Sequence, residues 1–249
     1  MYSLTGKVAL VTGSSMGLGK CIALCLARAG ACVIVNDPVG GQLAEEVVAE
    51  IEALGQETDL VVCDIRDAAS VSKMVETILG RFKKVDILIN NAGISIDATT
   101  INYEPGAWDQ VVKTNLSGAF YCSKYCLPSM TKQKWGRIIN ISSVVGQIGV
   151  IGTPAYTASK AGLIGFTKTL AKEMARKGVT VNCLALGYFQ GGSLLDTIPK
   201  KIAEHILRQI PMGRWGQPEE ISSAINFLVS DSASYITGQT ININGGYFM

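Results

Sequence analysis

The chain has 249 residues, of which 48% are hydrophobic and 17% are charged, a composition that excludes a disordered protein. Its 22 lysines and arginines nearly balance its 20 aspartates and glutamates, and neither sign forms runs. Charge therefore gives no argument for a nucleic-acid or membrane-surface partner. The length suits one large α/β domain or two small ones.

Short β-branched segments alternate with segments of helical periodicity along the chain. The predicted strands are residues 7–12, 31–36, 58–64, 85–90, 136–142, 179–185 and 239–244. Helices are predicted at residues 17–29, between 43 and 54, between 71 and 82, at 108–130 and 157–176, and from residue 218. Because the strands are apolar on both faces, we expect α/β architecture: a single doubly wound parallel sheet, Rossmann-like, with helices on both faces and one domain over residues 1–249.

The seven cysteines and the single histidine bear on compartment and metal binding. An odd number of cysteines with no C-x-x-C pair favours free thiols in a reducing cytosol. His205 is far in sequence from any cysteine pair, which argues against a zinc site, and we expect no metal. The first residues lack the apolar stretch of a signal peptide, and no window reaches membrane-spanning length. We therefore expect a cytoplasmic protein.

The stretch TGSSMGLG, residues 12–19, joins the first predicted strand to the first predicted helix. Its glycines permit a tight turn and a close approach of phosphate to the backbone, and the helix N-terminus supplies free N–H groups. The spacing G-x-x-x-G-x-G is a variant of the dinucleotide fingerprint. Ligands of such sheets bind at the carboxyl ends of the strands. We expect the cofactor to contact Gly13, Ser15, Met16, Gly17, Leu18 and Gly19.

The same stretch has a second interpretation, because residues 13–17 spell G-x-S-x-G, the nucleophile elbow of serine hydrolases. Ser15 would then be the nucleophile, and His205 would have to be its base. Against this hypothesis, the elbow would follow the first strand, with no earlier strand and loop to provide the oxyanion donor.

Asp37 closes the second predicted strand, about twenty residues after the glycine turn. An acidic side chain there accepts hydrogen bonds from ribose hydroxyls and repels a 2′-phosphate. No basic residue lies in the glycine turn or directly follows Asp37. NAD is therefore favoured over NADP. The alternative explanation is a turn-forming aspartate before Pro38.

Further motifs follow in order: VCDI with Asp64, NNAG at residues 90–93, KTNLSG with Asn115, NISSVVG around Ser143, YTASK, and NINGG near the C-terminus. Together with the glycine turn, this ordered set resembles the short-chain dehydrogenase/reductase family over nearly the whole chain. Within that family, MGRWGQPEEI and INGGYFM are most similar to the 3-oxoacyl-thioester reductases, which act on acyl-carrier-protein or coenzyme A esters.

The resemblance implies a catalytic set of Asn115, Ser143, Tyr156 and Lys160. On a helix, Tyr156 and Lys160 would project from one face. Free tyrosine has a pKa of about 10, too high for an efficient base near neutrality, and the charges of Lys160 and an oxidised nicotinamide would stabilise tyrosinate. The resemblance further implies that Ser143 holds the substrate oxygen, that Lys160 bonds the nicotinamide ribose, and that Asn115 holds a water relaying protons to Lys160.

The resemblance extends to the cofactor and to assembly. It implies that Asp64 and Ile65 meet the adenine and that the remaining cofactor contacts come from Asn91, Ala92, Gly93, Tyr156, Lys160, Gly187 and Phe189. It also implies a homotetramer. Two structural alternatives stay open: Asn91 bracing neighbouring backbone, and Asn115 marking a local kink in a helix.

One segment departs from the family pattern, in which Pro-Gly follows the sixth strand and a threonine comes after it. In ALGYFQGGSLL, Leu186 replaces the proline and Gly191 occupies the position of the threonine. Ser193 is a candidate to replace the threonine hydroxyl. We interpret residues 187–213 as a substrate lid with a glycine hinge. The expected substrate contacts are Ser95, Ser143, Val145, Gln147 and Tyr188.

The sequence therefore predicts an NAD-dependent oxidoreductase that interconverts a secondary alcohol and a ketone. The expected substrates are a 3-hydroxyacyl-CoA and its 3-oxoacyl-CoA, in a degradative pathway because NAD favours oxidation. The alternatives are a polyol, hydroxysteroid or other small-alcohol dehydrogenase, the serine hydrolase using Ser15, and a catalytically silent scaffold subunit. The intact Tyr156–Lys160 pair argues against the scaffold.

Overall fold

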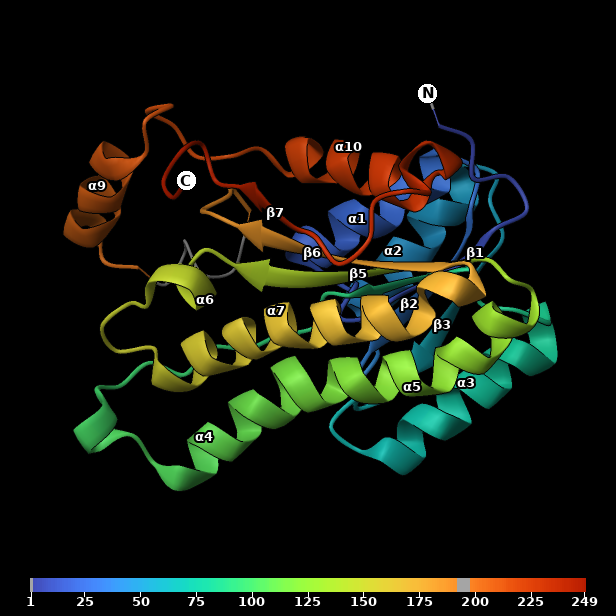
Figure 1. The fold of residues 1–249 in the computed structure, drawn as a ribbon, viewed down its shortest axis with the longest axis horizontal. Coiled ribbons are helices and arrows are strands. Elements are labelled where there is room, and N and C mark those ends of the chain that lie inside the picture. The colour runs from blue at the N-terminus through green and yellow to red at the C-terminus, as the bar shows by residue number, and fades with distance from the viewer. Residues whose placement is uncertain (1, 192–197) are drawn as a thin grey trace.

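A computed structural model describes residues 2–191 and 198–249 of the chain. Within these residues, seven strands form one sheet in the order β3-β2-β1-β4-β5-β6-β7, and all neighbouring strands are parallel (Figure 1). The strands are β1 (Val8–Val11), β2 (Cys32–Asp37), β3 (Thr58–Val62), β4 (Ile87–Asn90), β5 (Gly136–Ser143), β6 (Val179–Leu186) and β7 (Thr240–Ile243). The predicted doubly wound fold is confirmed.

Helices cover both faces of this sheet (Figure 1). One face carries α1 (Gly17–Arg28), α2 (Gln42–Ala53) and α10 (Pro218–Val229). The other carries α3 (Ala68–Phe82), α5 (Gly118–Lys132) and α7 (Pro154–Met174). The short helices are η1 (Thr100–Asn102), α6 (Val145–Ile148), η3 (Ala175–Lys177), α9 (Lys200–Gln209) and η4 (Asp231–Ala233). None of the described helices has both the length and the apolarity needed to cross a bilayer.

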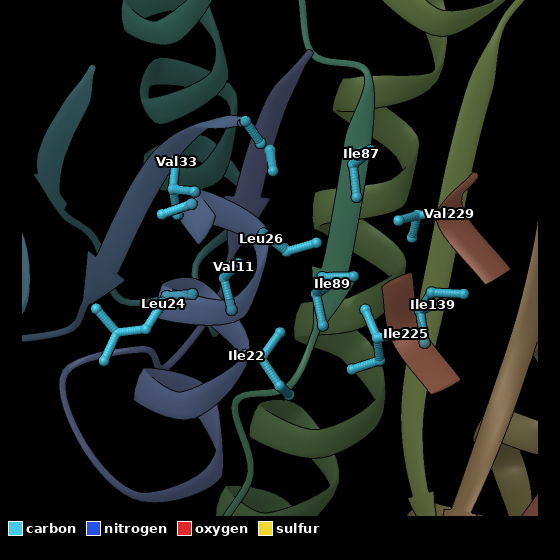
Figure 2. Packing of buried hydrophobic residues seen from close by; sticks show 14 of the residues in the cluster. Val11, Ile22, Leu24, Leu26, Val33, Ile87, Ile89, Ile139, Ile225 and Val229 are labelled. Carbon is cyan, nitrogen blue, oxygen red and sulfur yellow. The ribbon is translucent and has the colours of Figure 1, made fainter. Parts of the chain in front are cut away.

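The core consists of two layers because successive strand side chains point to opposite faces. Val11 and Val33 pack toward α1, whereas their neighbours Leu10 and Ile34 pack toward the α3 side. Figure 2 shows the first layer, in which Ile22 of α1 meets side chains of β1 and β4. Burying each aliphatic side chain of this size stabilises the fold by roughly 1.5–3 kcal/mol. The two layers fix the sheet as a rigid platform for the loops at its carboxyl edge.

The strand order reverses beside β1, which lies between β2 and β4. In sheets of this kind, the loops after two such strands separate at the carboxyl edge and leave a crevice for ligands. The glycine turn follows β1, and residues 91–93 follow β4, so both border this crevice. Helix α6 and helix α9 lie at the same end of the molecule (Figure 1).

The predicted helix at residues 108–130 is divided in the structure. Helix α4 (Pro105–Val112) passes into the π-helical turn η2 (Lys113–Ser117), and α5 continues from it. A π turn accommodates one extra residue, which shifts the side chains that follow relative to an α-helix, and such turns are frequent at functional sites. Asn115 lies in the middle of η2. The helix is therefore irregular at Asn115, where we considered a local kink.

A buried polar chain connects the sheet to the helix that carries Tyr156. Asn140 of β5 accepts a hydrogen bond from Asn90 Nδ2 at 2.8 Å and donates from Nδ2 to Thr167 Oγ1 of α7 at 2.8 Å. Asn90 Nδ2 also donates to Ser123 Oγ of α5 at 3.1 Å. Because these groups are excluded from water, the chain holds α5 and α7 in fixed positions on the sheet.

We predict that Asn140→Ala lowers the free energy of unfolding by about 2 to 3 kcal/mol, because it removes a buried side chain together with its hydrogen bonds to Asn90 and Thr167. Urea denaturation followed by circular dichroism measures this change. Thr77→Ala is the matched control: its hydroxyl donates to the Lys73 carbonyl on the exposed face of α3, and its loss should cost less than about 0.5 kcal/mol. Equal stability of the two variants would contradict the prediction.

Candidate active site

The four residues predicted to be catalytic converge at the carboxyl end of the sheet. Ser143 ends β5, Tyr156 and Lys160 lie one turn apart on α7, and Asn115 lies in η2. Only 8% of Ser143, 9% of Tyr156, 4% of Lys160 and 1% of Asn115 is exposed. On an exposed helix face, water would solvate a phenol and an ammonium. A buried pair instead needs hydrogen-bond partners from the protein.

Lys160 is held from two sides. Its Nζ donates a hydrogen bond to the backbone carbonyl of Ile141 at 2.7 Å and lies 5.5 Å from the centre of the Tyr156 ring. A Cβ added to Gly93 would lie 3.3 Å from both Lys160 Nζ and Asn115 Oδ1. The missing side chain of Gly93 therefore keeps open the space in front of these two groups, as a ribose bound there would require.

Asn115 braces the loop after β4 against α7. Its Oδ1 accepts from the Ile94 N–H at 2.8 Å, and its Nδ2 donates to the Ile94 carbonyl at 2.9 Å and to Ser159 Oγ at 3.0 Å. The Ser159 hydroxyl in turn donates to the Tyr156 carbonyl at 2.8 Å. The side chain of Asn115 thus fixes the loop that carries Gly93 relative to the helix that carries Tyr156.

Burial dominates the acidity of the central pair. Burial raises the pKa of Tyr156 to about 12. The negative charge of Asp97 also raises this pKa, whereas a hydrogen bond with Ser143 lowers it. Burial also lowers the pKa of Lys160 to about 8. Burial has this effect on Tyr156 because the desolvated phenolate is costlier than the neutral phenol. At neutral pH the pair is a neutral phenol and an ammonium.

The glycine turn has the conformation that its sequence predicts. Gly13 and Gly17 have φ angles of +61° and +55°, which favour glycine. A Cβ on Gly19 would collide with the Gly13 carbonyl oxygen, so the first turn of α1 packs directly on the loop. The side chain of Leu18 packs against the core, and that of Met16 is 56% exposed. Any contact of Leu18 with a cofactor is therefore made by its backbone.

Asn91 and Ala92 support this turn from the neighbouring loop. Asn91 Nδ2 donates to the carbonyls of Thr12 and Gly13, both at 2.9 Å. A Cβ on Gly13 would lie 2.9 Å from Ala92 Cα, so the two loops are in close contact. Asn91 therefore braces the neighbouring backbone, which is the structural role that we considered for it.

Asp37 has the turn-forming role that we considered for it. Its Oδ1 accepts from the N–H groups of Val39 and Gly40, both at 2.8 Å, which makes it a turn-forming aspartate. Its Oδ2 accepts a short hydrogen bond from the Ser15 hydroxyl, which links it to the glycine turn. The carboxylate is thus oriented beside the glycine turn.

The serine-hydrolase hypothesis is not favoured by this geometry. A nucleophilic serine needs a base as its hydrogen-bond acceptor, but the acceptor of Ser15 is Asp37, and only 7% of Ser15 is exposed. His205 is exposed on α9, where its ring nitrogen lies 3.1 Å from the side-chain nitrogen of Gln209.

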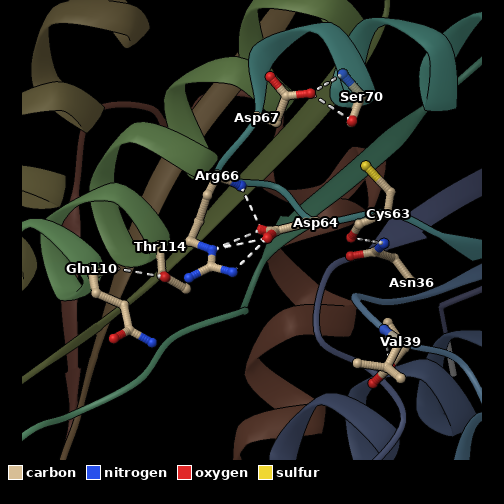
Figure 3. A network of polar contacts seen from close by, with 10 residues as sticks. Asn36, Val39, Cys63, Asp64, Arg66, Asp67, Ser70, Gln110 and Thr114 are labelled. Carbon is tan, nitrogen blue, oxygen red and sulfur yellow. Dashed lines mark hydrogen bonds and ion pairs between the residues drawn. The ribbon is translucent and has the colours of Figure 1, made fainter.

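A pocket of about 220 Å³ lies beside the glycine turn. Figure 3 shows part of its wall, where Arg66 reaches Asp64, and Gln110 and Thr114 lie nearby. Asn36 is held in place by hydrogen bonds from Nδ2 to the carbonyls of Val61 and Cys63. The lining is Gly13, Asn36, Pro38, Cys63, Asp64, Ile65, Arg66, Ala92, Ile94, Gln110 and Thr114. The structure thus brings together the residues expected at the adenine.

Comparisons with known proteins agree with this arrangement. A family model described as enoyl-(acyl carrier protein) reductase matches residues 13–248. The chain is 47% identical to the 3-oxoacyl-[acyl-carrier-protein] reductase of a Synechocystis strain over the full length of both. The chain belongs to the short-chain dehydrogenase/reductase family.

Other members of this family match over nearly the same length. The 3-oxoacyl-[acyl-carrier-protein] reductase FabG of Thermotoga maritima is 42% identical, with 98% of each chain covered. A crystal structure from Sinorhizobium meliloti 1021, provisionally assigned as a short-chain alcohol dehydrogenase, superposes with a TM-score of 0.93 at 35% identity. That comparison covers 98% of this chain and 97% of the other.

The segment that departs from the family pattern begins at the end of β6. The Leu186 carbonyl accepts from the Val144 N–H at 2.8 Å and from Ser143 Oγ at 3.4 Å. A Cβ on Gly187 would lie 2.8 Å from Asn244 Cα, so Gly187 permits the close approach of the residue after β7. This packing explains Gly187 without a contact to cofactor.

The segment then pairs with the loop before α10. Phe189, only 4% exposed, forms a bridge with Gly216, and its ring leaves no room for a side chain there. Gly191 has a φ of +68°, a backbone conformation that favours glycine. Gly192 and Ser193 lie outside the described residues, so the proposed replacement hydroxyl of Ser193 is not part of this structure.

The structure places the expected substrate residues in different surroundings. Val145 packs in a cluster with Tyr156, and Ser95 Oγ donates to Asp97 Oδ1 at 2.6 Å. Tyr188 packs edge-on against Trp215, with ring centres 5.9 Å apart. The Oε1 atom of Gln147 is buried and has no hydrogen-bond partner among the described residues.

Sequence reasoning missed the contribution of the C-terminal residues. Tyr247 and Phe248 pack against the cluster that contains Tyr156. Tyr247 also stacks edge-on against Tyr188, with ring centres 5.7 Å apart, and its hydroxyl donates to Gln209 Oε1 of α9 at 3.1 Å. The only signal for this role in the sequence is a pair of aromatic residues directly after the final glycines.

We predict that Lys160 gives the stability a pH dependence of defined sign. Its pKa of about 8 in the folded chain is below its ordinary value of 10.5, so in this window the unfolded chain binds a proton that the folded chain does not. Relative to Lys160→Met, the free energy of unfolding of the wild type should therefore rise from pH 8 to pH 10.5, by at most about 1.4 kcal/mol per pH unit.

Urea titrations of both proteins across that window measure the difference. The variant is needed as a reference because burial raises the pKa of thiols such as Cys183, to about 11, and this makes stability fall with pH in both proteins. If the free energy of unfolding of the wild type minus that of Lys160→Met stayed constant or fell as the pH rises, the prediction would be contradicted.

Proposed function

We propose that the chain is an NAD-dependent dehydrogenase that interconverts a 3-hydroxyacyl-CoA and a 3-oxoacyl-CoA. The observation that carries the proposal is the burial of Tyr156 and Lys160 beside Ser143, at the edge where the strand order reverses. The names of the relatives, which refer to 3-oxoacyl thioesters of acyl-carrier protein, support the substrate class. The acidic Asp37 supports NAD and thus the oxidative direction.

The residues at the crevice fit a nicotinamide dinucleotide, because Gly13 and Gly17 give the loop before α1 positive φ angles, and a Cβ at Gly93 would narrow the space in front of Lys160. Gly13, Gly17 and Gly19 would hold the pyrophosphate, Asp37 the adenosine ribose, and Lys160 the nicotinamide ribose. Asp64 and Ile65 would hold the adenine. When bound, the dinucleotide accepts or supplies the hydride.

The side chains account for the proton and for the charge on the substrate oxygen. In reduction, neutral Tyr156 gives its phenolic proton to the substrate oxygen, and Ser143 donates a hydrogen bond to the same atom. In oxidation, Tyr156 must first lose that proton, which its pKa of about 12 opposes. Lys160, charged at neutral pH and next to the ring, stabilises the phenolate and conducts the proton away from the site.

The NAD preference rests on charge near the adenosine ribose. The Asp37 carboxylate is oriented by the Ser15 hydroxyl and by two backbone N–H groups. Its neighbour in the turn is the uncharged, exposed Met16. A 2′-phosphate would meet a negative charge here with no basic side chain from the glycine turn.

The proposal includes a lid, an assembly and a location. Residues 187–213 form the substrate lid, supported by the positive φ of Gly191. A homotetramer is supported by the partly exposed Trp108 of α4 and Phe120 of α5, since Phe120 stacks on Phe166 of α7 with ring centres 6.0 Å apart. A cytoplasmic location is supported by seven free cysteines.

The first test is Tyr156→Phe. The variant removes only the proton-bearing oxygen, so turnover should fall by about three orders of magnitude or more while the Kd for NADH changes less than about threefold. Initial rates would be measured with a 3-hydroxyacyl-CoA, the matching acyl-carrier-protein thioester and a simple secondary alcohol. Near-normal turnover of the variant would refute the role of Tyr156, and a preference for the simple alcohol would favour the small-alcohol alternative.

The second test is Asp37→Asn. The amide keeps an oxygen that can accept from Val39 and Gly40 but removes the negative charge. The ratio of kcat/KM for NAD to that for NADP should fall by about tenfold, because the 2′-phosphate no longer meets a carboxylate. Glu46→Gln on the exposed part of α2 serves as the control for a general change in charge. A wild type that already prefers NADP would overturn the assignment of Asp37.

A further inference from the structure

Three aromatic rings lie in contact with one another near Tyr156. Tyr188, which follows β6, packs edge-on against Tyr247 with ring centres 5.7 Å apart, and also against Trp215 with ring centres 5.9 Å apart. We refer to Tyr188, Tyr247 and Trp215 as the aromatic wall. Rings at these separations are in van der Waals contact, so an alkyl chain cannot pass between them unless a ring moves.

The aromatic wall borders the buried cluster that contains Tyr156. Tyr247 and its neighbour Phe248 pack against this cluster, which also includes Val145. Burial, followed by the charges of Tyr247 and Tyr156, raises the pKa of Tyr188 to about 12. The three phenols therefore lie close together, and the rings of Tyr188 and Tyr247 bound the space beside Tyr156.

Hydrogen bonds hold Tyr247 in this position. Its hydroxyl donates to Gln209 Oε1 of α9 at 3.1 Å. The turn that carries Tyr247 is fixed by Asn244, whose Oδ1 accepts from the Gly246 N–H at 3.0 Å and whose Nδ2 donates to the Phe248 carbonyl at 2.9 Å. Both the backbone and the hydroxyl of Tyr247 are thus held, and a ligand would have to break these contacts to displace the ring.

A cavity of about 290 Å³ adjoins the aromatic wall, because Tyr188 is part of its lining. Ile210 and Met212 also line this cavity, whereas neither Ser143 nor Tyr156 does. Its volume is near the lower end of the range for sites that hold small ligands. Tyr188 therefore stands between Tyr156 and a space that is large enough to hold part of an alkyl chain.

The two ends of an acyl thioester differ in size, and this difference sets its orientation. Coenzyme A or an acyl-carrier protein is too large to be enclosed in this site, so the carrier must remain on the solvent side. The segment between α6 and α7 exposes Ile148, Val150 and Ile151, and it lies on the opposite side of α6 from α9 (Figure 1). A carrier that approaches Tyr156 over this open segment directs the far end of the acyl chain toward the aromatic wall.

We propose that the aromatic wall makes the chain selective for short acyl groups, because Tyr188 and Tyr247 occupy the space into which a longer acyl chain would extend. The inference rests on the proposed function, since it requires a 3-hydroxyacyl thioester at Tyr156. A 3-hydroxybutyryl group has only a methyl group beyond the reacting carbon, whereas a 3-hydroxydecanoyl group has an alkyl chain there. Steric overlap with two fixed rings rejects the longer group.

The test compares kcat/KM for 3-hydroxybutyryl-CoA and 3-hydroxydecanoyl-CoA with NAD as the oxidant. The wild type should favour the short substrate by at least about 100-fold. Tyr247→Ala removes one ring of the aromatic wall, so it should lower this ratio at least about tenfold and raise kcat/KM for the long substrate itself. Such a gain of activity cannot result from a loss of packing alone.

Tyr188→Ala opens the neighbouring cavity and should shift the preference in the same direction through an independent change. Tyr247→Phe keeps the ring and removes only the hydrogen bond to Gln209, so the preference for the short substrate should change less than about threefold. Tyr235→Ala is the matched control, because Tyr235 is fully exposed and precedes β7 at the opposite edge of the sheet. Its rates with both substrates should equal those of the wild type.

The outcomes separate this inference from the proposed function. If the wild type oxidises neither thioester, the proposed function fails and the inference with it. If the wild type oxidises both with similar kcat/KM, the proposed function stands and the aromatic wall does not select chain length. The same conclusion holds if Tyr247→Ala and Tyr188→Ala, each shown to be folded by its NADH fluorescence, lose activity with both substrates by the same factor.

Tyr247→Phe decides between the ring and the hydroxyl. If this variant shifts to the long substrate as far as Tyr247→Ala does, the hydrogen bond to Gln209 sets the limit and the steric role of the ring is refuted.

Discussion

The buried ammonium of Lys160 is the constraint on which the rest of the site depends. A buried charge is costly unless it is paired or hydrogen-bonded, and here the Ile141 carbonyl at 2.7 Å provides that partner. Helix α7 must therefore lie directly on β5, and the Ser142 hydroxyl fixes it there by donating to the Lys160 carbonyl at 2.7 Å. Gly146 permits the same closeness from α6, because a Cβ on it would lie 2.7 Å from the Lys160 carbonyl carbon.

The two ends of the crevice differ in how far their charged groups are exposed to solvent. At the end that holds Tyr156 and Lys160, the groups are buried, so salt has little effect on their electrostatic interactions. At the adenine end, Asp64 and Arg66 are exposed charges whose interaction with each other is screened by salt. The groups around Lys160 are therefore part of the buried core, whereas Asp64 and Arg66 line their pocket without supporting the core.

The sheet and the glycine turn could be predicted from the sequence because each depends on local patterns: apolar strands, and glycines at positions such as Gly13 that need a positive φ. The π turn at Asn115 could not, since one extra residue in a helical turn leaves the periodicity of the flanking helices unchanged. Tyr247 was missed because its contact with Tyr188 joins distant segments. The pKa of Tyr156 could not be predicted either, because it depends on burial, which spacing does not reveal.

The departure at Leu186 leaves the catalytic end intact for a simple reason. The contacts that join residue 186 to Ser143 and Val144 are made by its backbone carbonyl, which a proline also has. The close packing of Gly187 against Asn244 then directs the chain away from the sheet, and the bridge between Phe189 and Gly216 continues that course. The contacts that position Ser143 and Val144 against residue 186 therefore do not depend on the side chain of residue 186.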